Sequence, residues 1–161
     1  MIEIDTPEGD RMTEEEMVEF LRSHGHGVLS LPDDGDVHSI PVSFGYADEE
    51  GVVYLYLNRF GEESTKLDLL LGTDRASIVA YDVESRAEWR SVSLTGELRD
   101  LGSTTSRTST TDLANKQHIR EIMAENAWFP EFADESEEIN ESRVFMLVVD
   151  EMTGRQGEAF L

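Results

Sequence analysis

The sequence contains no cysteine. This absence excludes disulfide bonds, thiolate zinc sites and cysteine nucleophiles. The chain also lacks an apolar run near the roughly 18 residues that a membrane-spanning helix needs. Its first residues do not show the basic and then apolar pattern of a secretory signal. We therefore expect a protein of the cytoplasm.

Basic residues are scarce. The 161 residues include 13 lysines and arginines against 35 acidic residues, which gives a formal net charge of -22. Such a surface repels nucleic-acid backbones and anionic membranes, so we expect no nucleic acid and no membrane as a partner. The acidic residues are scattered along the chain and are not gathered in a tail. This composition resembles that of cytosolic proteins from halophilic microorganisms, so we interpret the charge as an adaptation to the solvent.

Alternating apolar residues predict about six strands. They lie near residues 28–31, 37–46, 52–58, 76–82, 89–101 and 144–149. Hairpin-length turns join most of them, and one of these turns is expected at Pro32-Asp33-Asp34-Gly35. The pattern predicts a mainly β fold, in which one antiparallel sheet closes on itself as a small barrel with two or three flanking helices. The length fits a single domain, residues 1–161, with residues 1–11 and 156–161 at its periphery.

Helical patterns occur at three places. Thr13 and Glu16 form a capping box in front of the first helix, whose apolar residues fall on one face. Further helices are expected over residues 64–71 and 112–125. Residues 127–141 contain a proline and many acidic residues, and we interpret them as an acidic connection.

The usual catalytic and metal-binding motifs give no assignment. The histidines are His24, His26, His38 and His118. His24 and His26 form an H-x-H pair, but nothing nearby completes a metal site at a convincing spacing. The G-x-S-x-G, P-loop and G-x-G-x-x-G patterns do not occur. A hydrolase or a metalloenzyme therefore has no positive support, and we expect no metal.

Lys66 is one of two lysines in the chain and stands at a predicted helix start, after Ser64 and Thr65. The free N–H groups of a helix start, its positive dipole end and an ammonium can together hold a phosphate. A solvated lysine that follows an N-cap serine is the alternative. From these three residues alone, both interpretations stay open.

Three segments of the chain stand out together. The first is Pro41-Val42-Ser43-Phe44-Gly45-Tyr46, in which a proline within a strand marks an edge or an opening of the sheet. The second runs from Tyr54 to Asn58 and continues into the Lys66 helix, and the third is Trp89-Arg90-Ser91-Val92-Ser93-Leu94-Thr95-Gly96. Their order resembles that of the pyridoxamine 5'-phosphate oxidase-like flavin-binding split barrels, in particular the nitroimidazole-reductase-like branch. The resemblance extends from Met12 to Arg155.

The resemblance implies a six-stranded antiparallel split β-barrel of the FMN-binding type. It also implies a homodimer that binds FMN in two clefts between its subunits. In this sequence Lys66 would hold the phosphate, with Ser64 and Thr65 supplying hydroxyl or backbone N–H groups. The other cofactor-binding residues implied are Val42, Ser43 and Phe44 at the isoalloxazine ring, Tyr56, Leu57 and Asn58 as another wall, and Arg90, Ser91 and Val92 near the ribityl chain or the phosphate. Lys66 and Arg90 are the best candidate pair of cations for the phosphate.

The chain departs from the family pattern at two places. The branch commonly has a histidine where Tyr56 stands, so chemistry tied to that side chain does not carry over. The R-x-H segment that pyridoxamine 5'-phosphate oxidation requires is replaced by Gly154-Arg155-Gln156-Gly157-Glu158, and we do not expect that activity. Two roles stay open for Phe60, Trp128 and Phe129, which either shape the substrate side of the flavin or pack at the dimer surface.

Two classes of function are compatible with this sequence. The first is an FMN-dependent oxidoreductase that takes hydride from a nicotinamide and reduces a small-molecule substrate, with the chemistry carried by the flavin. No catalytic side chain is assigned, because no residue of the sequence must act as acid or base. The second is a flavin-binding protein that stores flavin or senses it without turnover. A relative that binds a deazaflavin or haem in the same cleft is a further alternative.

We expect the thermal unfolding temperature to rise steeply with added salt, because screening relieves the repulsion among the acidic residues. Melting curves between about 0.1 M and about 1 M potassium chloride measure this effect. An unfolding temperature that stays constant over this range contradicts the halophilic interpretation.

Overall fold

The computed structural model describes residues 10–60, 72–103, 117–124 and 139–160, of which residues 56–60, 103 and 139–142 are described by their backbone alone. The predicted helix over residues 64–71, the aromatic pair Trp128 and Phe129, and most of the predicted acidic connection lie outside these ranges. Among the described residues, no helix has the length and hydrophobicity needed to cross a membrane.

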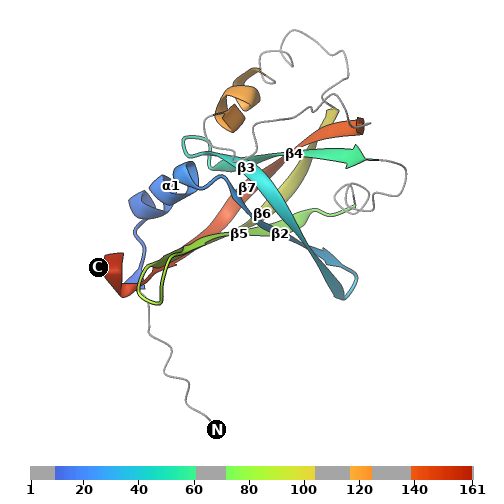
Figure 1. Cartoon of the computed structure of the whole chain (residues 1–161). Helices are drawn as coiled ribbons and strands as arrows, with labels where there is room; N and C mark the ends of the chain where they lie inside the picture. The colour runs from blue at the N-terminus through green and yellow to red at the C-terminus, as the bar shows by residue number, and fades with distance from the viewer. Residues whose placement is uncertain (1–9, 61–71, 104–116, 125–138, 161) are drawn as a thin grey trace.

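The described elements are mostly strands (Figure 1). In chain order they are β1 (Asp10–Arg11), α1 (Glu14–Ser23), β2 (His26–Asp33), β3 (Asp36–Ala47), β4 (Val52–Phe60), β5 (Arg75–Val83), β6 (Trp89–Ser103), β7 (Ile139–Gln156) and the 3₁₀ turn η1 (Glu158–Phe160). Residues 117–124 form a further helical segment, within the helix predicted over residues 112–125.

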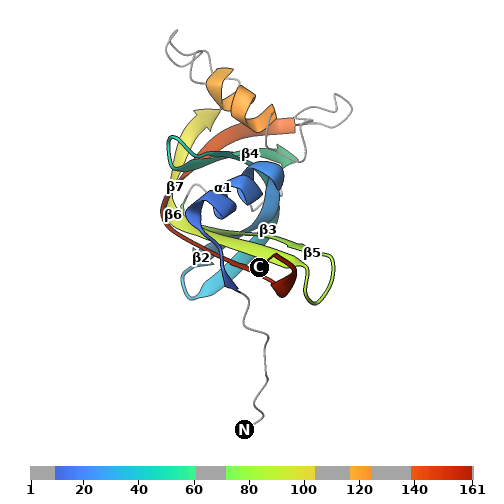
Figure 2. The same ribbon diagram turned by 90° about the vertical axis from the view of Figure 1, so that its left-hand side faces the viewer.

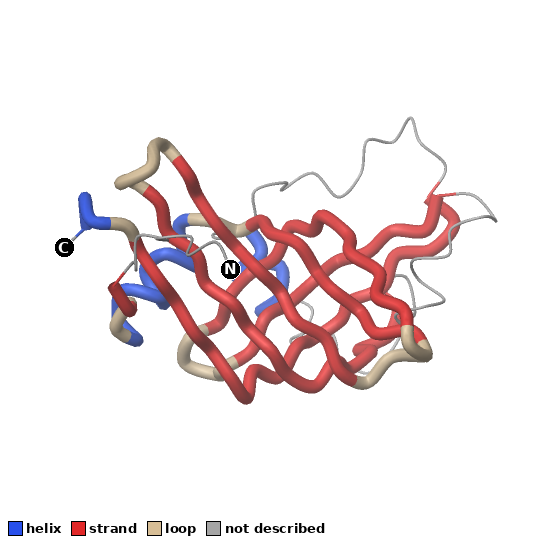
Figure 3. Tube along the Cα trace, turned by 90° about the horizontal axis from the view of Figure 1, so that it is seen from below, coloured by secondary structure: helices blue, strands red, loops and turns tan. Residues whose placement is uncertain are grey.

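All strand pairings are antiparallel, and the sheet closes on itself. The order is β1-β7-β4-β3-β2-β5-β6, and an additional pairing joins β6 back to β7. Figure 3 shows the long strands crossing one another around the barrel. The mainly β antiparallel barrel is therefore confirmed. The sheet has seven strands where about six were predicted, because the two residues of β1 add a short edge beside the end of β7.

Several strand boundaries differ from the prediction, among them the ends of β2 and β7. Pro32 and Asp33 belong to β2, and the turn is confined to Asp34 and Gly35, whose φ angles are 42° and 95°. Two positive φ angles are typical of the tight hairpins whose twist matches that of the flanking strands. At the other end of the chain, β7 begins at Ile139, within the predicted acidic connection, because the β4 backbone pairs with residues that carry no apolar pattern.

Helix α1 covers one end of the barrel (Figure 2). Its capping box is present as predicted, with the Thr13 hydroxyl accepting from the Glu16 N–H and the Glu16 carboxylate accepting from the Thr13 N–H. The helix buries Phe20 and Leu21 completely in the barrel core. Burial of each such side chain contributes about 1.5–3 kcal/mol. A single helix of ten residues thus fills one end of the barrel.

Alternation along the strands divides the buried residues into two clusters. Val53, Leu55 and Phe145 point into the barrel, where they pack with α1. Their neighbours Tyr54 and Val144 point to the other side, where they pack against the helical segment 117–124. Because successive side chains of a strand point to opposite faces, β4 and β7 serve both clusters.

A polar contact ties the helical segment to the turn after β3. The Tyr54 hydroxyl donates a 2.6 Å hydrogen bond to the Glu50 carboxylate, which is also paired with His118. Burial and this hydrogen bond raise the pKa of Tyr54. Burial also acts to raise the pKa of Glu50, but the hydrogen bonds from Tyr54 and His118 outweigh it and lower the pKa. The contact therefore favours an ionised Glu50 beside a neutral Tyr54.

Candidate functional site

Strands β3 and β4 separate in the middle of the sheet. Their described pairing runs from Ala47–Val52 to Phe44–Leu55. Before Phe44, β3 pairs with β2, and beyond Leu55, β4 pairs with β7. Two groups of predicted site residues, Val42–Phe44 and Tyr56–Asn58, therefore lie next to the point where the two strands part. We call this opening the β3–β4 split.

The backbone N–H and C=O groups of β3 point alternately toward β2 and toward β4. Phe44 donates its N–H to the Gly25 carbonyl on the β2 side, at 2.8 Å. Because backbone groups alternate along an antiparallel strand, the N–H and C=O of Ser43 point to the opposite side, toward β4. Pro41 lies on that side too, where a missing N–H breaks no sheet hydrogen bond. The predicted role of Pro41, as a marker of an opening, fits this geometry.

A cavity of about 370 Å³ lies beside the split, on the outer face of β2 and β3. We call it the β2–β3 pocket. Its described lining consists of His26, Gly27, Val28, Pro41, Val42, Ser43 and Tyr81. Binding sites for small ligands are typically about 300–1,000 Å³ and mostly apolar, with a few polar groups. The β2–β3 pocket fits this description and contains two predicted site residues, Val42 and Ser43.

The predicted residues on β3 contribute in different ways. Phe44 is fully buried in the barrel core and Val42 is almost so. Ser43 is partly buried, and its hydroxyl donates to the Gly25 carbonyl at 3.2 Å. Phe44 can therefore meet a ligand only through its backbone. Ser43 combines a side chain that lines the pocket with backbone groups on the β4 side of β3, where the split begins.

His26 lines the β2–β3 pocket, and its pKa is lowered from the ordinary value of a histidine. Burial lowers the pKa of its imidazole, the neighbouring His24 lowers it further, and Asp82 acts in the opposite direction. His24 stacks on Phe20, with ring centres 4.3 Å apart, and its Nε2 lies 3.5 Å from the Asp82 carboxylate. The described residues include no group of three side chains that could hold a metal ion. The two imidazoles of the H-x-H pair have different neighbours among the described residues.

The third predicted segment is divided between the two faces of β6. Ser91 points outward and lines a second cavity, of about 460 Å³, together with Ser93, Thr153 and Arg155. Val92 points inward and is fully buried. Arg90 lies on the inward side as well, so its side chain does not share the face of Ser91. The sheet thus brings Ser43 and Ser91 to the same outer face and leaves Arg90 off it.

Arg90 is held between two aromatic rings. Its guanidinium carbon lies 5.2 Å from the centre of the Phe20 ring and 4.6 Å from that of Phe160. Such cation–π contacts contribute about 0.5–2 kcal/mol each. Within the described part of the chain, its buried Nε has no hydrogen-bond partner. A contact between Arg90 and the cofactor stays a prediction, and it requires the guanidinium to leave these rings.

Other predicted site residues are described in part or lie outside the described ranges. Tyr56, Leu57 and Asn58 are placed by their backbone, opposite Val144, Arg143 and Ser142 of β7. Ser64, Thr65 and Lys66 lie outside the described residues. The geometry above therefore concerns the end of the site at which the ring is expected, and the phosphate end stays a prediction.

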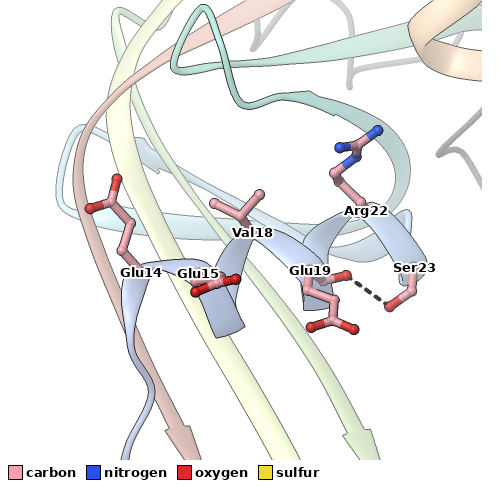
Figure 4. A pocket seen from close by; sticks show the side chains of 6 residues that line it. All are labelled: Glu14, Glu15, Val18, Glu19, Arg22 and Ser23. Atoms are coloured by element: carbon pink, nitrogen blue, oxygen red, sulfur yellow. Dashed lines mark hydrogen bonds between the residues drawn. The ribbon is translucent and has the colours of Figure 1, made fainter.

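A larger cavity, of about 790 Å³, runs along the outer face of α1 (Figure 4). Its described lining is Glu14, Glu15, Val18, Glu19, Arg22 and Ser23, and the Ser23 hydroxyl donates to the Glu19 carbonyl at 3.1 Å. Three carboxylates against one guanidinium disfavour an anionic ligand such as a phosphate. Because none of the predicted site residues lines this cavity, we place the candidate site at the β2–β3 pocket.

Sequence reasoning missed His26, Val28 and Tyr81 as pocket residues. His26 and Val28 stand two apart on β2, and Tyr81 lies on β5, which pairs with β2 through Val28 and Val79. Alternation along the predicted strands places Val28 and Tyr81 on an outer face, whereas His26 lies before the strand predicted over residues 28–31. The order of the strands, which brings β5 beside β2, was not contained in the local pattern.

Solved structures resemble this fold at low sequence identity. A FAD-binding protein from Mesorhizobium loti matches with a TM-score of 0.66 and 17% identity, over 91% of this chain and 96% of that protein. A putative 5-nitroimidazole antibiotic resistance protein from Bacteroides thetaiotaomicron matches with a TM-score of 0.61 and 18% identity, over 90% of this chain and 85% of that protein. A FAD and heme binding protein from Mycobacterium smegmatis matches with a TM-score of 0.62 and 15% identity, over 91% of this chain and 72% of that protein.

These likenesses support the split-barrel fold. No curated protein matches the sequence of this chain significantly. The family model described as pyridoxamine 5'-phosphate oxidase, in contrast, matches residues 13–156. The match covers nearly the same part of the chain as the resemblance noted from the sequence, and it confirms that resemblance. This protein therefore belongs to the pyridoxamine 5'-phosphate oxidase family.

Proposed function

We propose that this protein binds a flavin, FMN, with the isoalloxazine ring at the β3–β4 split and the β2–β3 pocket. The observation that carries the proposal is the separation of β3 from β4 beside an apolar pocket. Strand edges that have parted from their neighbours offer N–H and C=O groups to the polar edge of a ring. Similar folds described as FAD-binding, from Mesorhizobium loti, and as FAD and heme binding, from Mycobacterium smegmatis, support a flavin as the ligand.

The described residues fit the ring end of the cofactor. In the proposal, Val42 and the backbone of Phe44 flank the ring, and Ser43 meets its polar edge. The segment from Tyr56 to Asn58 forms the opposite wall of the split. Apart from His26, whose pKa is lowered, the described lining of the β2–β3 pocket contains no basic residue. Such a lining suits an uncharged ring better than a phosphate.

The phosphate end of the cofactor is assigned to residues further along the chain. We propose that Lys66 binds the phosphate with Ser64 and Thr65, as the sequence predicts. Ser91 lies on the outer face that also carries Ser43, and we propose it for the ribityl chain, with the backbone of Val92 beside it. Arg90 joins this set only if it leaves Phe20 and Phe160.

The reaction we propose is the reduction of a small acceptor with electrons from a nicotinamide. The cofactor would supply hydride and electron transfer, while the protein sets access and electrostatics. In this scheme Val28, Pro41 and Val42 keep water from the ring, and Ser43 orients it. Membership of the family does not by itself establish oxidation of pyridoxamine 5'-phosphate. The proposed activity is separate from it, because the C-terminal R-x-H segment is missing.

We further propose a homodimer with the cofactor between its subunits. Val79, Tyr81 and Val83 recur at every second residue of β5, and their side chains are 37%, 56% and 64% exposed. Tyr81 also lines the β2–β3 pocket. A row of exposed apolar side chains beside a ligand pocket is typical of a surface that another subunit covers. The cytoplasmic location, the adaptation to salt and the single domain stay predictions.

The absorbance spectrum of the purified protein tests the proposed function. We expect the spectrum of a bound flavin, or saturable binding of FMN by protein purified without it. A deazaflavin or haem spectrum would replace FMN by one of the alternative ligands. A protein that is colourless and binds none of the three would contradict the site assignment.

Anaerobic mixing of the flavin-loaded protein with a reduced nicotinamide separates an enzyme from a carrier. We expect the flavin absorbance to be lost and to return when an acceptor is added. If the absorbance persists with both NADH and NADPH, the storage or sensor function is favoured and the nicotinamide-dependent reaction is rejected.

Replacement of Lys66 tests the phosphate end of the site. We expect Lys66→Ala to weaken FMN binding by about 1.5–3 kcal/mol, because a charge-assisted hydrogen bond to the phosphate is lost. Fluorescence titration gives the dissociation constant. Lys116→Ala is the matched control, because it removes the other lysine of the chain and the same charge. If both variants bind FMN as the wild type does, Lys66 is a solvated surface residue.

Replacement of Tyr81 tests the proposed dimer. We expect Tyr81→Glu to raise the dimer dissociation constant at least about tenfold, which corresponds to about 1.4 kcal/mol, because a carboxylate would be buried between the subunits. Sedimentation velocity in high salt measures the association without strong long-range repulsion. Leu101→Glu, at an exposed residue near the far end of β6, is the control. A wild-type protein that is monomeric at all concentrations would reject the dimer.

A further inference from the structure

His26 occupies a central position in the β2–β3 pocket. It is the first residue of β2 and pairs with Ser43 of β3. On the other side of β2, Tyr81 of β5 completes the same pocket. His26 points to this outer face because Leu29 and Leu31, at odd-numbered positions of the same strand, are fully buried in the barrel. The imidazole is therefore held where a ring bound beside Ser43 would cover it.

The charged and titratable groups around His26 come from three elements. His24 lies just beyond the C-terminus of α1, Asp82 and Tyr81 lie on β5, and β3 contributes the uncharged Ser43. The Asp82 carboxylate lies 3.5 Å from Nε2 of His24, and its charge also favours the protonated form of His26. The pocket side of His26 therefore carries no charged group among the described residues, and the neighbouring carboxylate is that of Asp82.

We propose that His26 contacts the flat ring of the ligand in the β2–β3 pocket, and that its imidazole must be uncharged for the ring to bind. This inference rests on the proposed function, because the ring in question is that of a flavin. It assigns to this chain a binding residue that lies outside all three segments of the sequence resemblance.

The physical reason is the loss of water from the imidazole. Burial already lowers the pKa of His26, and His24 adds to this effect, while Asp82 opposes it. An uncharged ring placed over the pocket removes more water and supplies no negative charge, so it lowers the pKa further. The neutral imidazole can both donate and accept a hydrogen bond, as the polar edge of a flavin requires.

The sign of the pH dependence follows from this shift. In this proposal the pKa of His26 is lower in the complex than in the free protein. Binding is therefore strongest at pH values above the pKa that His26 has in the free protein. Affinity falls as the pH decreases through that value, by up to about tenfold per pH unit. It levels off below the pKa of the complex. A ligand with a negative edge against His26 would give the opposite dependence.

Riboflavin is the probe for the test, because it has the ring of FMN and no phosphate. The phosphate of FMN titrates at about pH 6 and would add a pH dependence of its own. Fluorescence quenching gives its dissociation constant between about pH 5 and 8. We expect the wild-type protein to lose affinity toward acidic pH and His26→Gln to lose this dependence. Asp82→Asn should move the loss to lower pH, because it removes the group that favours the charged imidazole.

His38→Gln is the matched control. His38 is an exposed histidine of β3 that pairs with Asp33 at 3.0 Å, near the turn at the far end of the β2–β3 hairpin, and we expect its replacement to leave the pH dependence unchanged. A second measurement follows the His26 imidazole by NMR and should find a lower pKa in the riboflavin complex than in the free protein.

The outcomes separate the two proposals. If the wild type binds neither riboflavin nor FMN at any pH, the proposed function fails and the inference about His26 fails with it. If riboflavin binds but His26→Gln keeps the wild-type pH dependence, or the pKa of His26 is unchanged or higher in the complex, flavin binding stands and the role of His26 is rejected.

Discussion

The separation of β3 from β4 beyond Phe44 and Leu55 is the constraint on which the rest of the structure depends. A strand that keeps both neighbours has all its backbone groups paired, whereas β3 pairs with β4 at one end and with β2 over the rest of its length. Pro41 fits this change of partner, because its nitrogen points away from β2 and would leave a gap in a fully paired strand. The long pairing of β6 with β7 closes the barrel at another side. The core can thus be sealed while the split keeps strand edges for a ligand.

The acidic composition of the protein limits which residues can supply a cation to a phosphate. With a formal net charge of -22, cations are few, and several arginines of the described part pair with acidic residues across the sheet. Arg75 binds Asp150 at 2.5 Å, and its hydrogen bond lowers the pKa of that carboxyl. Such a solvent-exposed pair contributes little to stability. Arg90 instead lies between two rings at the end of the barrel. A cation for a phosphate must therefore come from a residue without such a structural role, and the chain has only two lysines.

Local signals predicted most of the fold, and long-range pairing decided what they missed. The capping box of Thr13 and Glu16 and the alternation of the strands are local, and both are present in the structure. The start of β7 at Ile139 was missed, because the residues after it carry no apolar alternation and pair with β4 from far away in the chain. For the site, the alternation of side chains along a strand also means that neighbouring residues of one sequence motif do not all face the same ligand. Arg90 and Ser91 are neighbours in one motif, yet a strand directs their side chains to opposite faces.

The position of His26 shows why a pocket of this kind cannot be found by motif alone. In the sequence, His26 forms an H-x-H pair with His24, near which no further metal ligand stands at a convincing spacing. In the fold, the two imidazoles have different surroundings, and His26 shares its pocket with residues 15 and more positions away. A shift of β2 by one residue would turn His26 into the barrel and expose Leu29 and Leu31. Because both leucines are fully buried, the hydrophobic core fixes the register of β2, and through it the side chain that a ligand would meet.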